Sequence, residues 1–142
     1  MPKASDNYFN RYNQFVKDIL ETYEIKKIKN GLGIYAVVTL KVSPTSTPSK
    51  VVDAFDWKMG KSEYNDFKVN GPFIDWKNAS IEVANQLIQK SLIPQNVEIT
   101  ITDIMGRYVD TTPNQIKEVT IRGVFDQCGI QFTTKTIEEL LK

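Results

Sequence analysis

The sequence predicts an α+β fold, a two-layer α/β sandwich in which helices cover one face of a mostly antiparallel sheet. Three observations support this prediction. A β-branched run at residues 34–42 follows a two-glycine turn at 30–33, as in a hairpin. Residues 97–102 alternate strictly between apolar and polar side chains, as in a half-buried strand. Segments 76–92 and 112–129 carry apolar residues at helical spacing.

The first half of the chain is expected to hold one helix and three strands. Apolar residues recur every three or four positions over residues 6–18, which predicts an amphipathic helix. Residues 21–29 partly alternate and are expected to form a strand. A hairpin should join this strand to residues 34–42, because Gly and Asn tolerate the positive φ of a tight turn. After a Ser/Thr/Pro-rich loop, residues 51–57 predict a third strand.

Capping residues mark the helix ends in the second half. Pro94 is expected to end the helix over residues 76–92, since proline cannot continue a helix. Thr112 is a good N-cap residue, and Gln115 completes a capping box. Gly129 is expected to terminate that helix.

The end of the chain is expected to hold a short strand and a helix. Residues 130–133 predict the strand, and a second capping box from Thr136 to Glu139 predicts the terminal helix. The order of strands, helix, strand and helix over 142 residues fits one domain, residues 1–142.

Composition excludes several classes of enzyme. The chain has no histidine and one cysteine, Cys128, so Ser-His-Asp catalysis, Cys-His catalysis and His-bearing zinc sites are excluded. Eighteen basic and 17 acidic residues leave a formal net charge of +1, which is not the strong positive field of a general nucleic-acid binder. We therefore expect a protein without enzymatic activity or cofactor, in which any RNA contact comes from a local patch.

The location of the protein is expected to be cytoplasmic. The N-terminal residues lack the apolar run of a secretory signal. No stretch approaches the ~20 apolar residues of a membrane span, so we expect no membrane partner.

Two motifs carry little weight. Gly60-Lys61-Ser62 is similar to the end of a phosphate-binding loop, but Phe55 stands where that loop needs its first glycine. Cys128 lies near the expected end of a helix and is interpreted as a small core side chain.

The carboxylates leave one enzymatic alternative open. Asp53 and Asp56, three residues apart on a strand, should face opposite sides of the sheet. Asp103 and Asp110 flank a turn, so a cleft that brings them together around an ion would indicate metal or acid/base chemistry.

Cations gather near two of the expected turns. Lys26, Lys27 and Lys29 precede the turn at Gly31, and Arg107 lies in a second turn. Lysines on a strand at the edge of a sheet also discourage edge-to-edge pairing. The alternative interpretation is that these cations contact phosphate groups.

The order of the elements and two short segments resemble domain IV of elongation factor G and its ribosomal-protection relatives. The family's first tip loop reads roughly Gly-Gly-Arg-Gly-Gln-Tyr-Gly, where this chain has Asn-Gly-Leu-Gly-Ile-Tyr-Ala over residues 30–36. The second tip reads Tyr-His-Glu-Val-Asp-Ser-Ser, where this chain has Gly-Arg-Tyr-Val-Asp-Thr-Thr over residues 106–112. The family's histidine is replaced by Arg107, and its first-loop arginine by Leu32.

The resemblance covers residues 20–133. It implies the ribosomal-protein type of sandwich with a left-handed β-α-β unit. The expected N-terminal helix within residues 1–20 has no counterpart in the family, and the expected C-terminal helix over residues 134–142 also lies outside the resemblance. The resemblance also implies that the two turns meet at one end of the molecule and reach RNA there. Ribosomal proteins, the protein subunit of ribonuclease P and small-molecule kinases share this architecture, so the fold does not fix the function.

The resemblance and the local lysines together predict an RNA-binding or ribosome-binding protein that contacts its partner through the two tips. Lys26, Lys27, Lys29 and Arg107 are expected to contact phosphates, and Tyr35 and Tyr108 to stack on bases. Gly31 and Gly33 shape the first tip. The alternative is a protein-interaction module of the inhibitor or immunity type, favoured by the near-zero net charge and by aromatic residues outside the helical stripes, namely Trp57, Tyr64 and Phe67.

Overall fold

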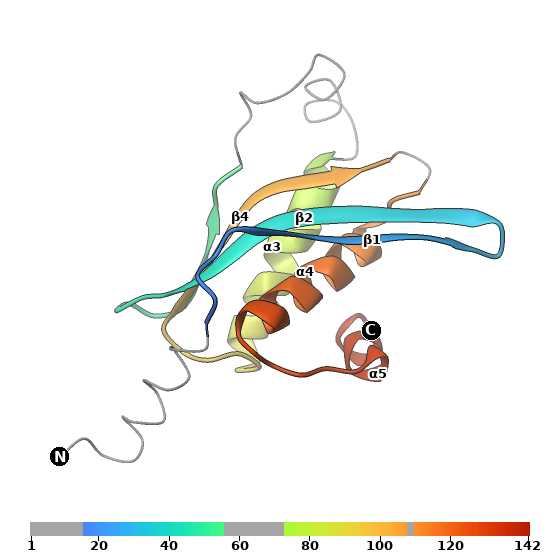
Figure 1. Ribbon diagram of the computed structural model, residues 1–142. Helices are drawn as coiled ribbons and strands as arrows, with labels where there is room; N and C mark the ends of the chain where they lie inside the picture. Colours follow the sequence, from blue (N-terminus) through green and yellow to red (C-terminus); the bar gives the residue numbers. More distant parts are fainter. Residues whose placement is uncertain (1–15, 56–72, 108–109) are drawn as a thin grey trace.

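The computed structural model describes residues 16–55, 73–107 and 110–142. Within these residues the chain forms a four-stranded sheet with helices on one face, which confirms the two-layer α+β sandwich (Figure 1). The strands are β1 (Glu21–Lys29), β2 (Leu32–Pro44), β3 (Lys50–Asp53) and β4 (Val97–Gly106), and the helices are α3 (Phe73–Gln89), α4 (Pro113–Gln127) and α5 (Thr134–Leu140).

The sheet is mostly antiparallel and has the strand order β1-β2-β4-β3. β2 pairs antiparallel with β1 on one side and with β4 on the other. β3 runs parallel to its neighbour β4, and α3 connects the two, so β3, α3 and β4 form a β-α-β unit. A parallel pair needs such a crossover because a short turn cannot reverse the chain twice.

The core lies between the sheet and helices α3 and α4. Alternate residues of β2, such as Val38 and Leu40, are fully buried, and so are Ile99 and Ile101 of β4. The period of two places these side chains on the helical face. A bulge opposite Thr39 and Leu40 shifts the register with β4. Trp76 of α3 is 1% exposed and is among the largest side chains of this core.

The ends of α4 confirm the predicted caps. The Thr112 hydroxyl accepts a hydrogen bond from the Gln115 N–H at 3.2 Å, and the Gln115 side chain accepts one from the Thr112 N–H at 2.9 Å. At the other end Gly129 has φ +68°, and the Ile130 N–H donates to the Phe125 carbonyl at 2.9 Å. This is a Schellman motif, which needs a left-handed residue at the glycine position.

The end of α3 differs from the prediction. The helix ends at Gln89, before Pro94 can interrupt it. Ser91 has φ +55°, and the Leu92 N–H donates to the Leu87 carbonyl at 3.0 Å. A Schellman motif therefore ends this helix with serine in place of glycine.

The predicted strand over residues 130–133 is wrong. These residues connect α4 to α5 without a strand, because the Ile130 N–H is used by the cap of α4. The terminal helix α5 covers Thr134–Leu140, but the predicted capping box from Thr136 to Glu139 does not begin it. Its N-cap is Thr133, whose hydroxyl accepts from the Thr136 N–H at 3.2 Å. The sequence has threonine at positions 133, 134 and 136, and each of them is a possible N-cap residue.

The predicted N-terminal helix lies mostly outside the described residues, and the part that can be compared, residues 16–18, is not helical. The N–H groups of Lys17 and Asp18 donate instead to the carbonyls of Gln127 and Val42, at 2.8 and 3.1 Å. Asp18 has φ +54°, which is incompatible with a continuing helix. The third strand is also shorter than predicted, because β3 ends at Asp53. Asp56, Trp57, Tyr64, Phe67 and the Gly60-Lys61-Ser62 motif lie outside the described residues.

Candidate nucleic-acid interface

The first predicted turn is the end of the β1–β2 hairpin. Asn30 and Gly31 form the two-residue loop, with φ values of +53° and +78°. Positive φ at both positions is the requirement of a type I′ turn, and the Asn-Gly pair meets it. β2 pairs with β4 only from Ala36 onward, so the hairpin extends about four residues, ~13 Å, beyond the end of β4 (Figure 1).

The second predicted turn connects β4 to α4 and folds against the backbone of β2. The Tyr35 N–H donates to the Asp110 carbonyl at 3.1 Å. The Thr111 hydroxyl donates to the Tyr35 carbonyl and accepts from the Arg107 N–H at 2.7 Å. Thr111 is buried, with 7% exposure. Two of these hydrogen bonds join the second turn to β2 at Tyr35, and the third lies within the second turn. The two turns therefore lie at the same end of the molecule, as the resemblance implies.

Two glycines allow this close approach. At Gly106, a Cβ atom would lie 2.7 Å from the Trp76 ring and from the Thr111 hydroxyl oxygen. At Gly33, a Cβ atom would lie 3.1 Å from the Asp110 carboxylate, which therefore rests over the hairpin. A larger residue at Gly106 would force Trp76 or Thr111 to move, and one at Gly33 would displace the Asp110 carboxylate.

Lys26, Tyr35 and Arg107 share the face of the sheet that is opposite the helices. Lys26 lies directly across from Tyr35 in the β1–β2 register. Cross-strand partners project on the same face, and Tyr35 alternates with the buried Ala36. The Arg107 guanidinium carbon is 4.6 Å from the centre of the Tyr35 ring, a cation–π distance. We call these three residues the tip patch.

The remaining predicted residues surround the tip patch or lie apart from it. Lys27 is exposed but belongs to the other face of β1, since Tyr23 and Ile25 of that alternation pack on the core. Lys29 lies opposite Leu32 in the register, next to the turn at Gly31. Tyr108 lies outside the described residues.

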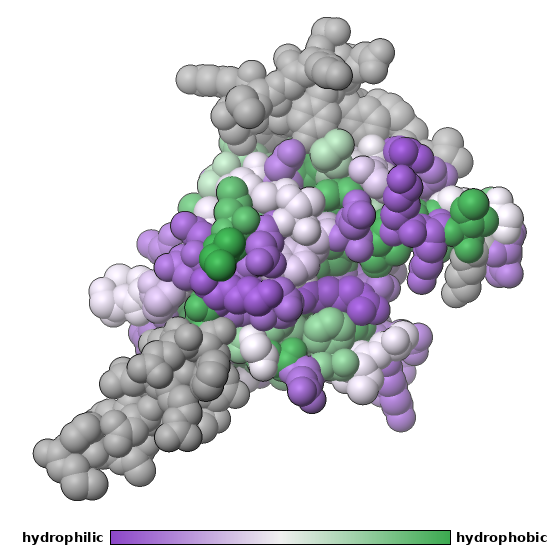
Figure 2. Space-filling view, viewed as in Figure 1, coloured by the Kyte–Doolittle hydropathy of each residue, from purple (hydrophilic) through white to green (hydrophobic). Residues whose placement is uncertain are grey.

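Exposed apolar side chains accompany the cations, and the sequence interpretation missed them. Ile28 is 80% exposed and Leu32 70% exposed, both beside the hairpin turn. Figure 2 shows hydrophobic and hydrophilic side chains side by side at the end of the molecule where Figure 1 places the hairpin. Their position within two residues of the Asn-Gly turn, one before it and one after it, was the available signal.

The acidic alternative is not supported by the geometry. Asp103 lies opposite Thr39 in the β2–β4 register, whereas the Asp110 carbonyl accepts from the Tyr35 N–H. Tyr35 precedes Thr39 by four residues on β2, so the two positions are ~13 Å apart along the strand. Asp53 forms an ion pair with Lys77 at 2.7 Å. In the part of the chain that the structure describes, no three metal-ligating side chains come together.

Cys128 is a core residue, as expected. It is 2% exposed, and burial raises the pKa of its thiol to about 12. The thiol is therefore protonated at neutral pH and is a poor nucleophile.

A separate polar cluster ties the segment before β1 to α4. The Asp126 carboxylate accepts from the Lys17 ammonium and from the Tyr23 hydroxyl, both at 2.7 Å. Burial alone would raise the pKa of Asp126, but these two hydrogen bonds outweigh it and lower that pKa. Burial and the bond to Asp126 raise the pKa of Tyr23. The buried Gln127 side chain donates to the Ile19 carbonyl at 2.7 Å, which completes a structural attachment.

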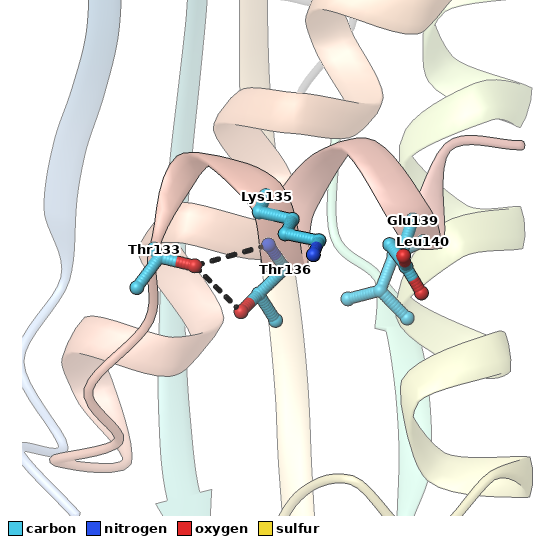
Figure 3. A pocket seen from close by; sticks show the side chains of 5 residues that line it. All are labelled: Thr133, Lys135, Thr136, Glu139 and Leu140. Atoms are coloured by element: carbon cyan, nitrogen blue, oxygen red, sulfur yellow. Dashed lines mark hydrogen bonds between the residues drawn. The ribbon is translucent and has the colours of Figure 1, made fainter.

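Two open depressions lie near the C-terminal helix. One, of about 390 Å³, is lined by Thr133, Lys135, Thr136, Glu139 and Leu140 (Figure 3). Its threonine hydroxyls bond to one another at 3.0 Å and cap α5. The other, of about 480 Å³, is lined by residues 126 and 129–132. The two threonines of the first depression are therefore engaged in the N-terminal cap of α5.

No protein-family model matches this chain, and no curated protein matches it. Among solved structures, homoserine kinase from Cytophaga hutchinsonii is similar, with a TM-score of 0.52 and 12% identity over 88% of this chain. A protein from Thermus thermophilus is more weakly similar, with a TM-score of 0.44 and 15% identity over 70% of this chain. The chain spans 40% of the length of the kinase and 14% of the Thermus protein.

The kinase match shows similarity of fold alone, and small-molecule kinases are among the proteins expected to share this architecture. Neither match confirms the resemblance to domain IV of elongation factor G, which stays an interpretation of the sequence. Of the helices in the described residues, none has the length and apolar character needed to cross a membrane.

Proposed function

We propose that this chain is a cytoplasmic, non-enzymatic protein that binds RNA, free or in the ribosome, through the tip patch. The observation that carries the proposal is the stacking of the exposed Arg107 on Tyr35, with Lys26 across the strand. The absence of histidine from the whole sequence favours binding over catalysis.

The stacked arginine has the chemistry needed for a phosphate or a base. The Arg107 guanidinium carbon lies 4.6 Å from the centre of the Tyr35 ring, and this contact restricts the arginine side chain, so less side-chain entropy is lost on binding. The edge of the guanidinium can donate two parallel hydrogen bonds to a phosphate, and its outer face can stack on an unpaired base. Lys26 adds a second positive charge on the same face.

The shape of the hairpin supports the same function. Its end extends beyond β4, and Lys27 and Lys29 occupy positions of β1 near the turn. A narrow projection can enter a groove or loop of structured RNA that a flat sheet could not reach. Positive charge there acts locally, so a net charge of +1 over the chain is no obstacle.

The test is the salt dependence of binding to protein-free ribosomal RNA and to purified ribosomes. The double variant Lys26→Ala/Arg107→Ala should weaken binding and reduce the log–log salt slope by roughly 1.4–1.8, the release of two counterions. The matched control is Lys90→Ala/Lys135→Ala, which removes two exposed lysines elsewhere. Equal losses in both variants, or binding that salt does not weaken, would contradict the proposal.

A second function, docking of a protein at the same tip, is favoured by the exposure of Ile28 and Leu32. Large apolar side chains at a projecting turn are typical of contact with a protein. Recovery of a protein partner after nuclease treatment, lost in Ile28→Ser/Leu32→Ser, would support this function over RNA binding.

A further inference from the structure

The outer edge of β1 has no partner strand among the described residues. β1 is the terminal strand of the sheet and pairs only with β2 among the described residues (Figure 1). It has nine residues, Glu21–Lys29, whereas the opposite edge strand β3 has four. A long open edge exposes a row of backbone donors and acceptors that can pair with another strand.

The backbone of β1 alternates between the partner strand and the open edge. The Tyr35 N–H donates to Asp110 on the β4 side, whereas the Val42 carbonyl accepts from Asp18 on the β1 side. The backbone groups of the even-numbered residues of β2 therefore bond to β1. In the β1–β2 register these residues lie opposite the odd-numbered residues of β1, whose backbone groups bond to β2 in return. The N–H and C=O groups that face the outer edge belong to Thr22, Glu24, Lys26 and Ile28, and no strand among residues 16–55, 73–107 and 110–142 pairs with them.

The charges along β1 are complementary to a reversed copy of the same strand. Glu21 and Glu24 occupy its first half, and Lys26, Lys27 and Lys29 its second half. An antiparallel copy centred on Ile25 places Glu24 opposite Lys26 and Glu21 opposite Lys29 in each half of the pair. Glu24 and Lys26 are exposed and form no ion pair with other described residues, so both are available.

The direction of the backbone groups and the charges of the side chains favour the same register. With Ile25 at the centre, Glu24 meets Lys26 and Thr22 meets Ile28, which joins the residues whose backbone groups face the edge. If one strand slips by two residues in either direction, the same backbone groups still face each other. The slip then puts Glu24 opposite Glu24 or Lys26 opposite Lys26. Like charges directly opposite one another destabilise a strand pair.

We propose that β1 pairs antiparallel with β1 of a second copy of this chain, in the register centred on Ile25. The two sheets then form one continuous sheet with two-fold symmetry, in which every contact occurs twice. Glu24 opposite Glu24 disfavours one shifted register and Lys26 opposite Lys26 disfavours the other, whereas the register centred on Ile25 pairs opposite charges. This inference does not rest on the proposed RNA binding.

The test is a charge swap measured by sedimentation equilibrium of the purified full chain without RNA. Glu24→Lys places two lysines opposite each other on both sides of the central Ile25, and Lys26→Glu does the same with glutamates. Each single variant should dimerise about tenfold or more weakly than the wild type. A mixture of the two variants, or the double variant Glu24→Lys/Lys26→Glu, restores opposite charges and should recover dimerisation.

A backbone variant tests the edge itself. Glu24→Pro removes an N–H that faces the open edge, so it should abolish dimerisation while the β1–β2 ladder and the circular dichroism spectrum persist. The inference is overturned if the wild type remains a monomer at about 1 mM protein. It is also overturned if dimers form but the mixture of charge variants shows no recovery, since another surface then makes the contact.

Discussion

Thr111→Val is the substitution that most sharply probes the joint between the two turns. The Thr111 hydroxyl is the only group that bonds to both turns within the described residues, donating to the Tyr35 carbonyl and accepting from the Arg107 N–H at 2.7 Å. Valine has nearly the same shape, so packing is conserved while both hydrogen bonds are lost.

The expected loss in the free energy of unfolding follows from these two hydrogen bonds. Each lost bond leaves a backbone group without a partner at a site where the side chain is only 7% exposed. An unsatisfied buried group costs about 1–3 kcal/mol. Allowing for partial access of water, we expect the free energy of unfolding to fall by about 2–4 kcal/mol.

The assay is urea denaturation, with Thr22→Val as the matched control. Thr22 makes its hydroxyl contact, to Thr39 at 2.9 Å, on an exposed face of the sheet. The control should therefore change stability by less than about 0.5 kcal/mol. A Thr111→Val protein within about 0.5 kcal/mol of the wild type would refute the reasoning that this hydroxyl joins the turns.

Three further predictions concern stability. Gly106→Ala should cost about 1–3 kcal/mol in urea denaturation, because its Cβ would lie 2.7 Å from the Trp76 ring; no loss would show that the ring can move aside. Ser91→Gly should stabilise the protein by about 0.5–1 kcal/mol, since Ser91 has φ +55°; a lower melting temperature would contradict this. The lowered pKa of Asp126 adds stability that is present above about pH 4 and is lost as the pH falls through the folded-state value. In Asp126→Asn, the free energy of unfolding should fall less steeply as the pH is lowered below about 4. An unchanged pH dependence would show that the Asp126 carboxylate is not its source.

Local signals predicted the elements whose causes are local. The Asn30-Gly31 pair predicted the hairpin because its positive φ values depend only on those two residues. Thr112 and Gln115 predicted the start of α4 because their hydrogen bonds span three residues. Ser91 carried no comparable signal, since serine rarely adopts the left-handed conformation that ends α3.

The candidate site was predictable only in part, because its contacts join distant residues. The resemblance predicted that the two turns meet, and the hydrogen bond from the Tyr35 N–H to the Asp110 carbonyl confirms it. The stacking of Arg107 on Tyr35 and the packing of Asp110 over Gly33 depend on the β2–β4 register. Sequence spacing contains no information about that register.

The most direct measurement of the central claim is a titration of the isotopically labelled chain with single-stranded ribosomal RNA, followed by amide chemical shifts. If the two turns form one RNA-binding surface, the amides of Lys26, Tyr35 and Arg107 should shift together and saturate at the same RNA concentration. Shifts confined to α3 and α5, or different saturation of the two turns, would contradict a single surface at this end of the sheet.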